Sequence, residues 1–237
     1  MHLFQKISKI QFEGDKDELI QGIYTFINPY SYFVARRNPK IFDDFDKVFV
    51  DGSLFVSFFN FFFPKQRVNR VSFDMTSIGK EVFISSSANN KRIFFIGAKK
   101  SEIKATINIL KTEYKGLNIC GYRDGYFDSE NEKKKVLKYL LEINPDVVIV
   151  GMGTPLQEEF LSDLKGLGWK GTGFTCGGFL HQTANKLYYY PKYVNKLNLR
   201  WLYRLIREPH SRKRFLKTYP IFPFIFLYDV ILFRFKK

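Results

Sequence analysis

Residues 145–160, PDVVIVGMGTPLQEEF, have the pattern of a buried strand followed by a tight turn and the start of a helix. Val147 to Val150 is a continuous apolar run that is too short for a helix, which is typical of a strand buried on both faces of a parallel sheet. The glycines that follow permit a tight turn. We then expect Thr154 to cap a helix with Pro155 at its first position, where a missing N–H costs nothing. Such a unit binds ligands at the carboxyl end of a sheet, and the N-terminus of its helix suits a phosphate.

The rest of the chain alternates between strand-like and helix-like segments in the same way. The expected strands cover residues 23–27, 47–50, 93–96, 117–120, 147–150 and 173–176. Ile103, Ile107, Leu110 and Tyr114 have the spacing of one helix face, and residues 130–143 are also expected to be helical. This alternation indicates an α/β fold with a Rossmann-like, mostly parallel sheet that has helices on both faces. We assign residues 1–198 to this core and residues 199–237 to a C-terminal appendage.

The composition of the 237-residue chain indicates one large α/β domain, with or without an appendage. Its two cysteines, Cys120 and Cys176, are too few for a disulfide framework, and no apolar signal segment opens the chain. A reducing cytoplasm is therefore the simplest location. The histidines and cysteines are scattered along the sequence, so no metal-ligand cluster is visible and no cofactor is expected.

The C-terminal segment is the most basic part of a chain whose net charge is +15. From Arg200 to Lys237 there are ten Lys or Arg residues against two acidic residues, together with many apolar and aromatic residues. The apolar residues 221–235 are interrupted by Pro223 and Asp229 and fall short of the roughly 20 residues that a membrane-spanning helix needs. We therefore expect this tail to lie in the interface of an anionic membrane, and not to bind nucleic acid. The aromatic run 58–63 is expected to be core, with a second membrane or subunit contact as the alternative.

Three acidic segments lie where a carboxylate could act on a substrate. Asp74 lies just before a predicted helix and close to Arg70, where it would stay ionised and could serve as a general base; a helix cap is the alternative. Asp51-Gly52 follows a strand and could bind a sugar or ribose hydroxyl, although a turn is the commoner reason for this pair. Asp44-Phe45-Asp46 has the Asp-x-Asp form of metal-dependent glycosyltransferases, but it precedes a strand, so a solvated turn is favoured. His181 has no visible triad partner, and we expect it to have a hydrogen-bonding role.

Six segments occur in an order that resembles a known family. They are DG at 51–52, RVSFD at 70–74, GYRDGYF at 121–127, GMGTPLQEEF at 151–160, CGGF at 176–179 and LRWLYRLIREP at 199–209. From about residue 20 to 220 the chain resembles the WecB/TagA/CpsF glycosyltransferases, glycosyltransferase family 26. The resemblance implies transfer of a sugar from a UDP-sugar to an undecaprenyl-diphosphate-linked saccharide at the inner face of a bacterial membrane, by a peripheral enzyme that inverts configuration and requires no metal. Members build teichoic acid linkage units, capsule and exopolysaccharide.

The resemblance also implies roles for particular residues. Asp74 falls at the proposed catalytic base, and Gln157 falls at a pocket position that could hold the donor sugar or diphosphate. The segment Asn28-Pro29-Tyr30 replaces a Thr-Pro-Asn, His181 stands where the family has an acid, and Tyr189-Tyr190-Pro191 replaces Arg-Ala-Pro. These departures leave the donor sugar open, and N-acetylmannosamine is not assumed.

Arginines and helix N-termini are the expected means of neutralising a departing UDP without a metal. Arg204 and Arg214 match basic positions of the family's appendage, and Arg207 lies between them; the alternative for each is a solvated basic face that meets lipid headgroups. The expected substrate-binding residues are Asn28, Asp51, Gly52, Arg70, Gly153, Gln157, Gly177, Arg204, Arg207 and Arg214.

A nucleotide-binding or nucleic-acid-binding module that uses the basic tail is the main alternative to an enzyme. A nucleic-acid reader usually presents basic and aromatic residues across a defined platform, whereas here the basic residues flank an apolar segment. A dinucleotide oxidoreductase is less favoured, because GMGTPLQ lacks the third glycine of G-x-G-x-x-G. The sequence is compatible with a homo-oligomer and does not fix the oligomeric state.

Overall fold

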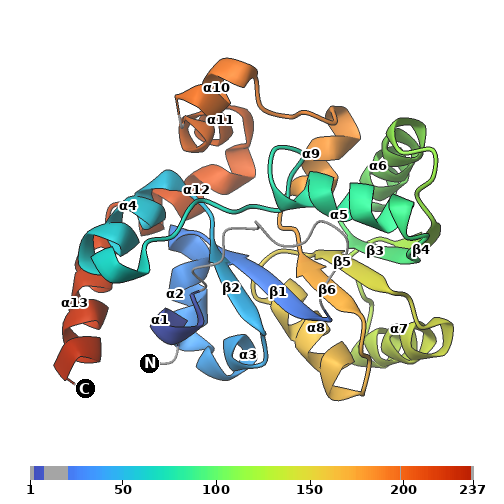
Figure 1. Ribbon diagram of the computed structural model, residues 1–237, viewed down its shortest axis with the longest axis horizontal. Helices are drawn as coiled ribbons and strands as arrows, with labels where there is room; N and C mark the ends of the chain where they lie inside the picture. The colour runs from blue at the N-terminus through green and yellow to red at the C-terminus, as the bar shows by residue number, and fades with distance from the viewer. Residues whose placement is uncertain (1–2, 8–20, 198, 236–237) are drawn as a thin grey trace.

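Six parallel strands form one sheet at the centre of the protein, with helices on both faces (Figure 1). The computed structural model describes residues 3–7, 21–197 and 199–235. The strands are β1 (Gly22–Ile27), β2 (Lys47–Val50), β3 (Ile93–Gly97), β4 (Ile119–Arg123), β5 (Val147–Gly151) and β6 (Thr172–Thr175). Their order in the sheet is β2-β1-β6-β5-β3-β4, and every neighbouring pair is parallel. The expected α/β fold with a parallel sheet is confirmed.

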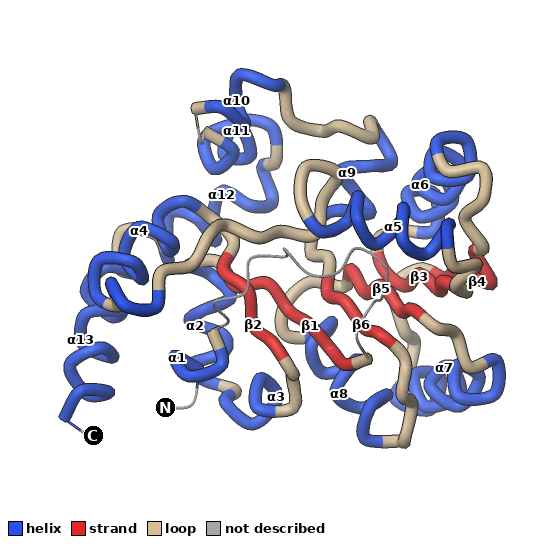
Figure 2. The backbone as a smooth tube through the Cα atoms, viewed as in Figure 1, coloured by secondary structure: helices blue, strands red, loops and turns tan. Residues whose placement is uncertain are grey.

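Helices connect the strands (Figure 2). The expected helix at 130–143 and the expected helix face from Ile103 to Tyr114 correspond to α7 and α6. The longer ones are α2 (Pro29–Arg37), α4 (Ser53–Phe62), α5 (Ile78–Ala88), α6 (Lys100–Glu113), α7 (Glu130–Ile143), α8 (Leu156–Gly166), α11 (Arg200–Arg207), α12 (Pro209–Thr218) and α13 (Phe222–Phe235). The shorter ones are α1 (Leu3–Lys6), α3 (Pro39–Asp43), the 3-10 helix η1 (Pro64–Gln66), α9 (Phe179–Asn185) and α10 (Lys192–Lys196).

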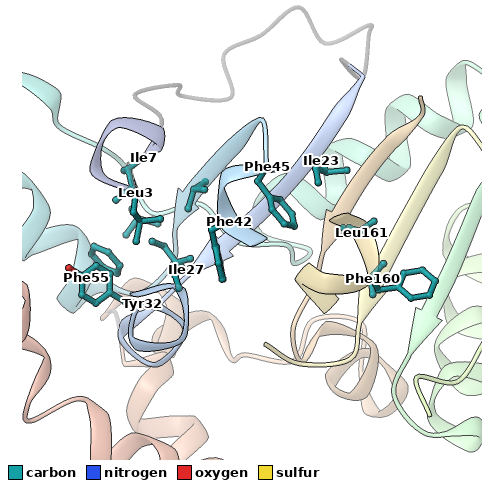
Figure 3. Close-up of a cluster of buried hydrophobic side chains, with 14 of the residues drawn as sticks. Leu3, Ile7, Ile23, Ile27, Tyr32, Phe42, Phe45, Phe55, Phe160 and Leu161 are labelled. Carbon is teal, nitrogen blue, oxygen red and sulfur yellow. The ribbon is translucent and has the colours of Figure 1, made fainter. Parts of the chain in front are cut away.

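Alternate residues of the strands enter two separate hydrophobic clusters, one on each face of the sheet. On one face Ile23 and Val148 pack with side chains of α1, α2, α3, α7, α8 and α13, and Figure 3 shows part of this cluster around Tyr32, Phe42 and Phe55. On the other face the neighbouring strand residues pack against α5, α6 and α9. Burial on both faces explains why β3 and β5 are continuous apolar runs.

The fourth strand lies two residues further along the chain than expected. Leu117 donates its N–H to Tyr114 O at 3.0 Å and belongs to a turn, while β4 runs from Ile119 to Arg123. β4 is an edge strand whose residues are only partly buried or exposed. Polar residues are tolerated in an edge strand, so the run of apolar residues in the sequence does not mark where β4 begins and ends.

The helix after β5 also begins differently from the expectation. Pro155 is the N-cap of α8 and not its first residue, and no side chain caps the helix. The Thr154 hydroxyl instead donates to Glu158 Oε1 at 3.1 Å. The expected Thr154 cap is therefore wrong, because a buried carboxyl group takes its hydrogen bond.

The last helix, α13, packs into the core. Phe222, Phe226 and Val230 are at most 1% exposed and belong to the cluster that contains α1 and α2. Asp229 is equally buried, and its Oδ2 accepts hydrogen bonds from the Tyr32 hydroxyl at 2.7 Å and the Arg36 Nε at 2.6 Å. We expected residues 221–235 to lie in a membrane interface, but one face of this helix packs against other helices of the core.

The opposite face of α13 remains apolar and exposed. Phe224, Leu227, Tyr228 and Ile231 follow one another at helical spacing on this face, which we call the outer stripe. In the described part of the chain no single helix passes the length and hydropathy test for a membrane span; residues 212–218 and 222–235 pass it together, with a bend of 50° between them. The division into residues 1–198 and 199–237 stays a prediction, and Asn198, at its boundary, lies outside the described residues.

Candidate active site

A cleft of about 1140 Å³ opens at the carboxyl ends of the strands. Because the strands are parallel, the loops that follow them meet at one edge of the sheet. The cleft is lined by the residues after β1, β2, β3, β5 and β6, and on its other side by α11, α12 and the turn after α12. The strand–turn–helix pattern of residues 145–160 predicted a ligand site at this edge.

Almost all of the expected site residues line this cleft. They are Asn28, Asp51, Gly52, Arg70, Asp74, Gly153, Gln157, Gly177, Arg204 and Arg214. Arg207 does not line it; its guanidinium lies 6.0 Å from the centre of the Tyr203 ring. Of these arginines, Arg204 and Arg214 therefore reach the cleft and Arg207 does not.

The Asp-x-Asp segment lies elsewhere. Asp46 immediately precedes β2, where its Oδ2 accepts hydrogen bonds from Ile23 N at 2.8 Å and Lys165 Nζ at 2.8 Å. It therefore ties the amino ends of two strands to α8, far from the carboxyl edge. Among the residues that the structure describes, no group of His, Cys, Asp or Glu is arranged to hold a metal ion.

Asp74 lies in the cleft and is held from several directions. Its Oδ2 accepts from Arg200 Nη1 at 2.6 Å and from the Ser72 hydroxyl at 2.6 Å, while its Oδ1 accepts from the Thr76 N–H at 2.7 Å. Burial by itself raises the pKa of Asp74, but the Arg200 guanidinium and these hydrogen bonds outweigh burial and hold the pKa below its usual value. Asp74 is therefore an ionised carboxylate at the edge of the cleft.

The cation that accompanies Asp74 is Arg200 and not Arg70, as the sequence suggested. Arg70 Nη1 donates to Asp51 Oδ1 at 3.2 Å and to the Ser72 hydroxyl at 2.9 Å. The Ser72 hydroxyl then donates to Asp74. One chain of hydrogen bonds through Arg70 and Ser72 thus connects the carboxylates of Asp51 and Asp74.

Gln157 belongs to a buried polar network below the cleft. Its Oε1 accepts from Gly177 N at 3.2 Å, and its Nε2 donates to Glu158 Oε1 at 2.9 Å. Thr25 donates to the same Glu158 oxygen at 3.0 Å, whereas Glu158 Oε2 has no hydrogen-bond partner and is buried. Burial raises the pKa of Glu158, against the effect of these donors. Glu158 therefore fixes the Gln157 amide, which lies between β5 and β6.

Two further pairs border the cleft. Arg204 Nε donates to Glu208 Oε2 at 3.0 Å, and the other Glu208 oxygen accepts from Gln182 Nε2 at 2.9 Å. The Arg214 guanidinium lies 5.3 Å from the centre of the Tyr30 ring. Both arginines are thus positioned by contacts that leave them at the surface of the cleft.

Sequence reasoning did not single out Arg200, Glu158 or Glu102 as site residues. Arg200 stands in the quoted LRWLYRLIREP segment, and Glu158 stands beside Gln157. Glu102 is the third residue of α6, where its Oε2 accepts from Lys99 N at 2.9 Å, a capping pattern that the sequence does reveal. Its Oε1 lies 2.7 Å from Nδ1 of His181, the partner that sequence analysis did not find.

One family model and three known proteins match most of this chain. The model of the Glycosyl transferase WecG/TagA/CpsF family matches residues 5–235. A UDP-Gal:alpha-D-GlcNAc-diphosphoundecaprenol beta-1,4-galactosyltransferase of Shigella boydii is 37% identical over 207 residues, which are 87% of this chain and 86% of the relative. An N-acetylglucosaminyldiphosphoundecaprenol N-acetyl-beta-D-mannosaminyltransferase of Bacillus subtilis (strain 168) is 30% identical over 84% of this chain and 77% of the relative. A protein with the same description from Bacillus spizizenii is 29% identical over 80% of this chain and 72% of the relative.

Proposed function

The chain belongs to the WecG/TagA/CpsF family of glycosyl transferases, and from this membership we propose that it transfers a sugar from a UDP-sugar to N-acetylglucosamine carried on undecaprenyl diphosphate. We propose galactose as the donor sugar, because the galactosyltransferase has a higher identity to this chain than the two mannosaminyltransferases. The product is a lipid-linked disaccharide for a bacterial cell-surface polysaccharide. The family match favours this activity over a nucleotide-binding or nucleic-acid-binding module.

The observation that carries the proposal is an ionised Asp74 in a cleft whose other charged residues are mostly cations. Arg70, Lys99, Arg200, Arg204 and Arg214 line the cleft, against the acids Asp51, Asp74 and Glu102. The excess of positive charge suits the diphosphate of a UDP-sugar, which gains negative charge as the sugar leaves. The position at the carboxyl edge of a parallel sheet suits a nucleotide as well.

The proposed reaction is a single displacement. The Asp74 carboxylate takes the proton of the acceptor hydroxyl while that oxygen attacks the anomeric carbon, and the bond to the UDP oxygen breaks from the opposite side. One base is sufficient for this reaction, which inverts the configuration of the sugar. The cleft arginines neutralise the departing diphosphate, and we propose that no metal ion is required.

The acceptor places the enzyme at a membrane, and the outer stripe of α13 is the surface that we propose meets it. Phe224 is 73% exposed, and Phe61 at the neighbouring end of α4 is 77% exposed. Lys213, Lys217 and Arg234 lie on α12 and α13 and would attract anionic headgroups. We propose peripheral binding at the inner face of the cell membrane, where UDP-sugars are supplied.

A transfer assay with purified full-length protein tests this function. With a short-chain polyprenyl-diphosphate N-acetylglucosamine as acceptor, we expect transfer from UDP-galactose, in the presence of EDTA, and weaker or no transfer from UDP-N-acetylmannosamine. Asp74→Asn keeps the shape of the side chain but cannot take the proton, so the rate should fall by about 100- to 10,000-fold while UDP binding persists.

Two results would contradict the proposal. Asp74→Asn turnover within threefold of the unmodified enzyme would remove Asp74 as the base. Complete loss of activity in EDTA, with recovery in manganese or magnesium, would show that the enzyme needs a metal ion.

A further inference from the structure

His181 and Glu102 form a pair inside the cleft that the proposed displacement does not use. His181 lies on α9 and Glu102 in the first turn of α6, and the His181 Nδ1 to Glu102 Oε1 distance is 2.7 Å. Both residues line the cleft, and 40% of the His181 side chain is exposed. The pair therefore stands where a bound substrate can reach the imidazole.

The pair is located at the topological switch point of the sheet. β3 is followed by α6 on one face, and its neighbour β5 is followed by α8 on the opposite face. The crevice between two such strands is the usual place for the phosphates of a nucleotide in an open α/β sheet. The N-terminus of α6 and Lys99 add positive potential to this crevice.

Glu102 fixes the orientation of the imidazole. The backbone N–H of Lys99 donates to Glu102 Oε2, so the carboxylate cannot rotate away from His181. Burial raises the pKa of Glu102, but the Lys99 N–H and His181 outweigh burial and keep the pKa below its usual value. An ionised Glu102 accepts a hydrogen bond from Nδ1–H, and Nε2 is then on the side of the ring away from Glu102.

We propose that His181, held by Glu102, binds a diphosphate oxygen of the sugar-nucleotide donor and stabilises the charge that develops on the departing UDP. This assignment rests on the proposed function. The charged groups at this end of α6 are Lys99, Lys100 and Glu102, and α9 has no charged side chain besides His181.

Calorimetric titration of the full-length protein with UDP-galactose tests the proposal. This ligand is chosen because its diphosphate, unlike that of UDP, does not change its charge between pH 6 and 8. His181→Gln should weaken binding by about tenfold to a hundredfold, the range expected for loss of a charge-assisted hydrogen bond. Uridine, which lacks the diphosphate, should bind equally to both proteins.

Two control variants separate the imidazolium from general charge effects. Lys186→Gln removes a positive charge just after α9, outside the cleft, and should leave the affinity unchanged. The double variant Glu102→Gln/His181→Gln removes the carboxylate that the single variant leaves without its partner. It should stay weaker than the unmodified protein, whereas recovery of the original affinity would show that repulsion by Glu102 caused the loss.

If His181→Gln does not fold, His181→Asn takes its place, with thermal unfolding as the check.

Equal UDP-galactose affinity of His181→Gln and the unmodified protein would overturn the proposal while leaving the proposed function intact. Weaker binding of the polyprenyl-diphosphate acceptor, with unchanged UDP-galactose binding, would also overturn it and assign His181 to the lipid diphosphate. Failure of the proposed function itself would look different, because the unmodified protein would then transfer no sugar from any UDP-sugar.

Discussion

Asp74 shows how one ion pair sets the charge of a buried carboxylate. Its carboxylate is buried, which favours the protonated form, yet Arg200 at 2.6 Å, two hydroxyl groups and one backbone amide favour the charged form more strongly. A carboxylate with a lowered pKa is available as a base over a wide pH range, although each proton it takes is held weakly. The Tyr190 ring, 4.6 Å below the Arg200 guanidinium, holds the arginine in this position.

Removing Arg200 should therefore change the pH profile of the enzyme. Arg200→Gln takes away the main group that lowers the Asp74 pKa, so this pKa should rise and the acid limb of kcat/KM should move to higher pH. Steady-state kinetics between pH 4.5 and 8 measure the acid limb of the pH profile of kcat/KM. Arg207→Gln, on the same helix but outside the cleft, is the matched control. An acid limb at the same pH in Arg200→Gln and the unmodified enzyme would mean that Asp74 does not set this limb.

Glu158 presents the opposite case, because burial raises its pKa. Above the usual glutamate pKa of 4.5, Glu158 binds more protons in the folded protein than in the unfolded chain. The free energy of unfolding therefore decreases as the pH rises above that value. Glu158→Gln cannot ionise. Urea unfolding at pH 5 and pH 8 should show a smaller loss of stability for this variant than for the unmodified protein.

Glu159 provides the comparison for this experiment, since it is the next residue of α8 and is only partly buried. Glu159→Gln should keep the pH dependence of the unmodified protein. If Glu158→Gln and Glu159→Gln lose the same stability between the two pH values, then burial does not raise the pKa of Glu158.

At the scale of elements, α13 combines a core face and an exposed apolar face. Phe226 is fully buried among aromatic rings of α1, α2 and α4, with Phe4 at 5.3 Å and Phe55 at 5.5 Å between ring centres. Phe224, two residues earlier, points away from the protein. The two faces should therefore respond differently to substitution.

Phe226→Ala should lower the free energy of unfolding by about 3–5 kcal/mol, because it leaves a cavity in a closely packed cluster. Phe224→Ser combined with Ile231→Ser should leave stability nearly unchanged but weaken binding to vesicles that contain anionic phospholipid. Urea unfolding and vesicle co-sedimentation measure the two effects, and added salt should weaken the vesicle binding of the unmodified protein. Undiminished vesicle binding by the double variant would exclude the outer stripe as the membrane contact.

At the scale of the whole molecule, the sequence predicts the sheet well because its signals are local. Apolar runs such as Val147 to Val150 and the glycine turns after them mark strands that are buried on both faces. The expected loops after these strands also predict the cleft, since parallel strands end at one edge. The edge strand β4 is misplaced because its burial is incomplete and its residues carry a weaker pattern.

The pairs that complete the site could not be predicted in this way. Arg200 and Asp74 are 126 positions apart, and His181 and Glu102 are 79 positions apart, so only the fold brings them together. The sequence also could not show whether α13 packs against protein or lies in lipid, because an apolar helix has the same composition in both cases. In this protein Asp229 fixes α13 against α2, since a buried carboxylate requires the partners that Tyr32 and Arg36 supply.

The attachment of α13 to α2 has a consequence for how the enzyme would meet its acceptor. The helix that holds Asp229 through Tyr32 and Arg36 is capped at its N-terminus by Asn28, which lies in the cleft. The outer stripe and the cleft are therefore joined by one short helix and not by a flexible tether. An enzyme that rested on a bilayer through the outer stripe would keep one orientation relative to the membrane, with its cleft at a constant height above the headgroups. A lipid-linked acceptor would then have only to diffuse sideways within the plane of the membrane, and the encounter would become a search in two dimensions.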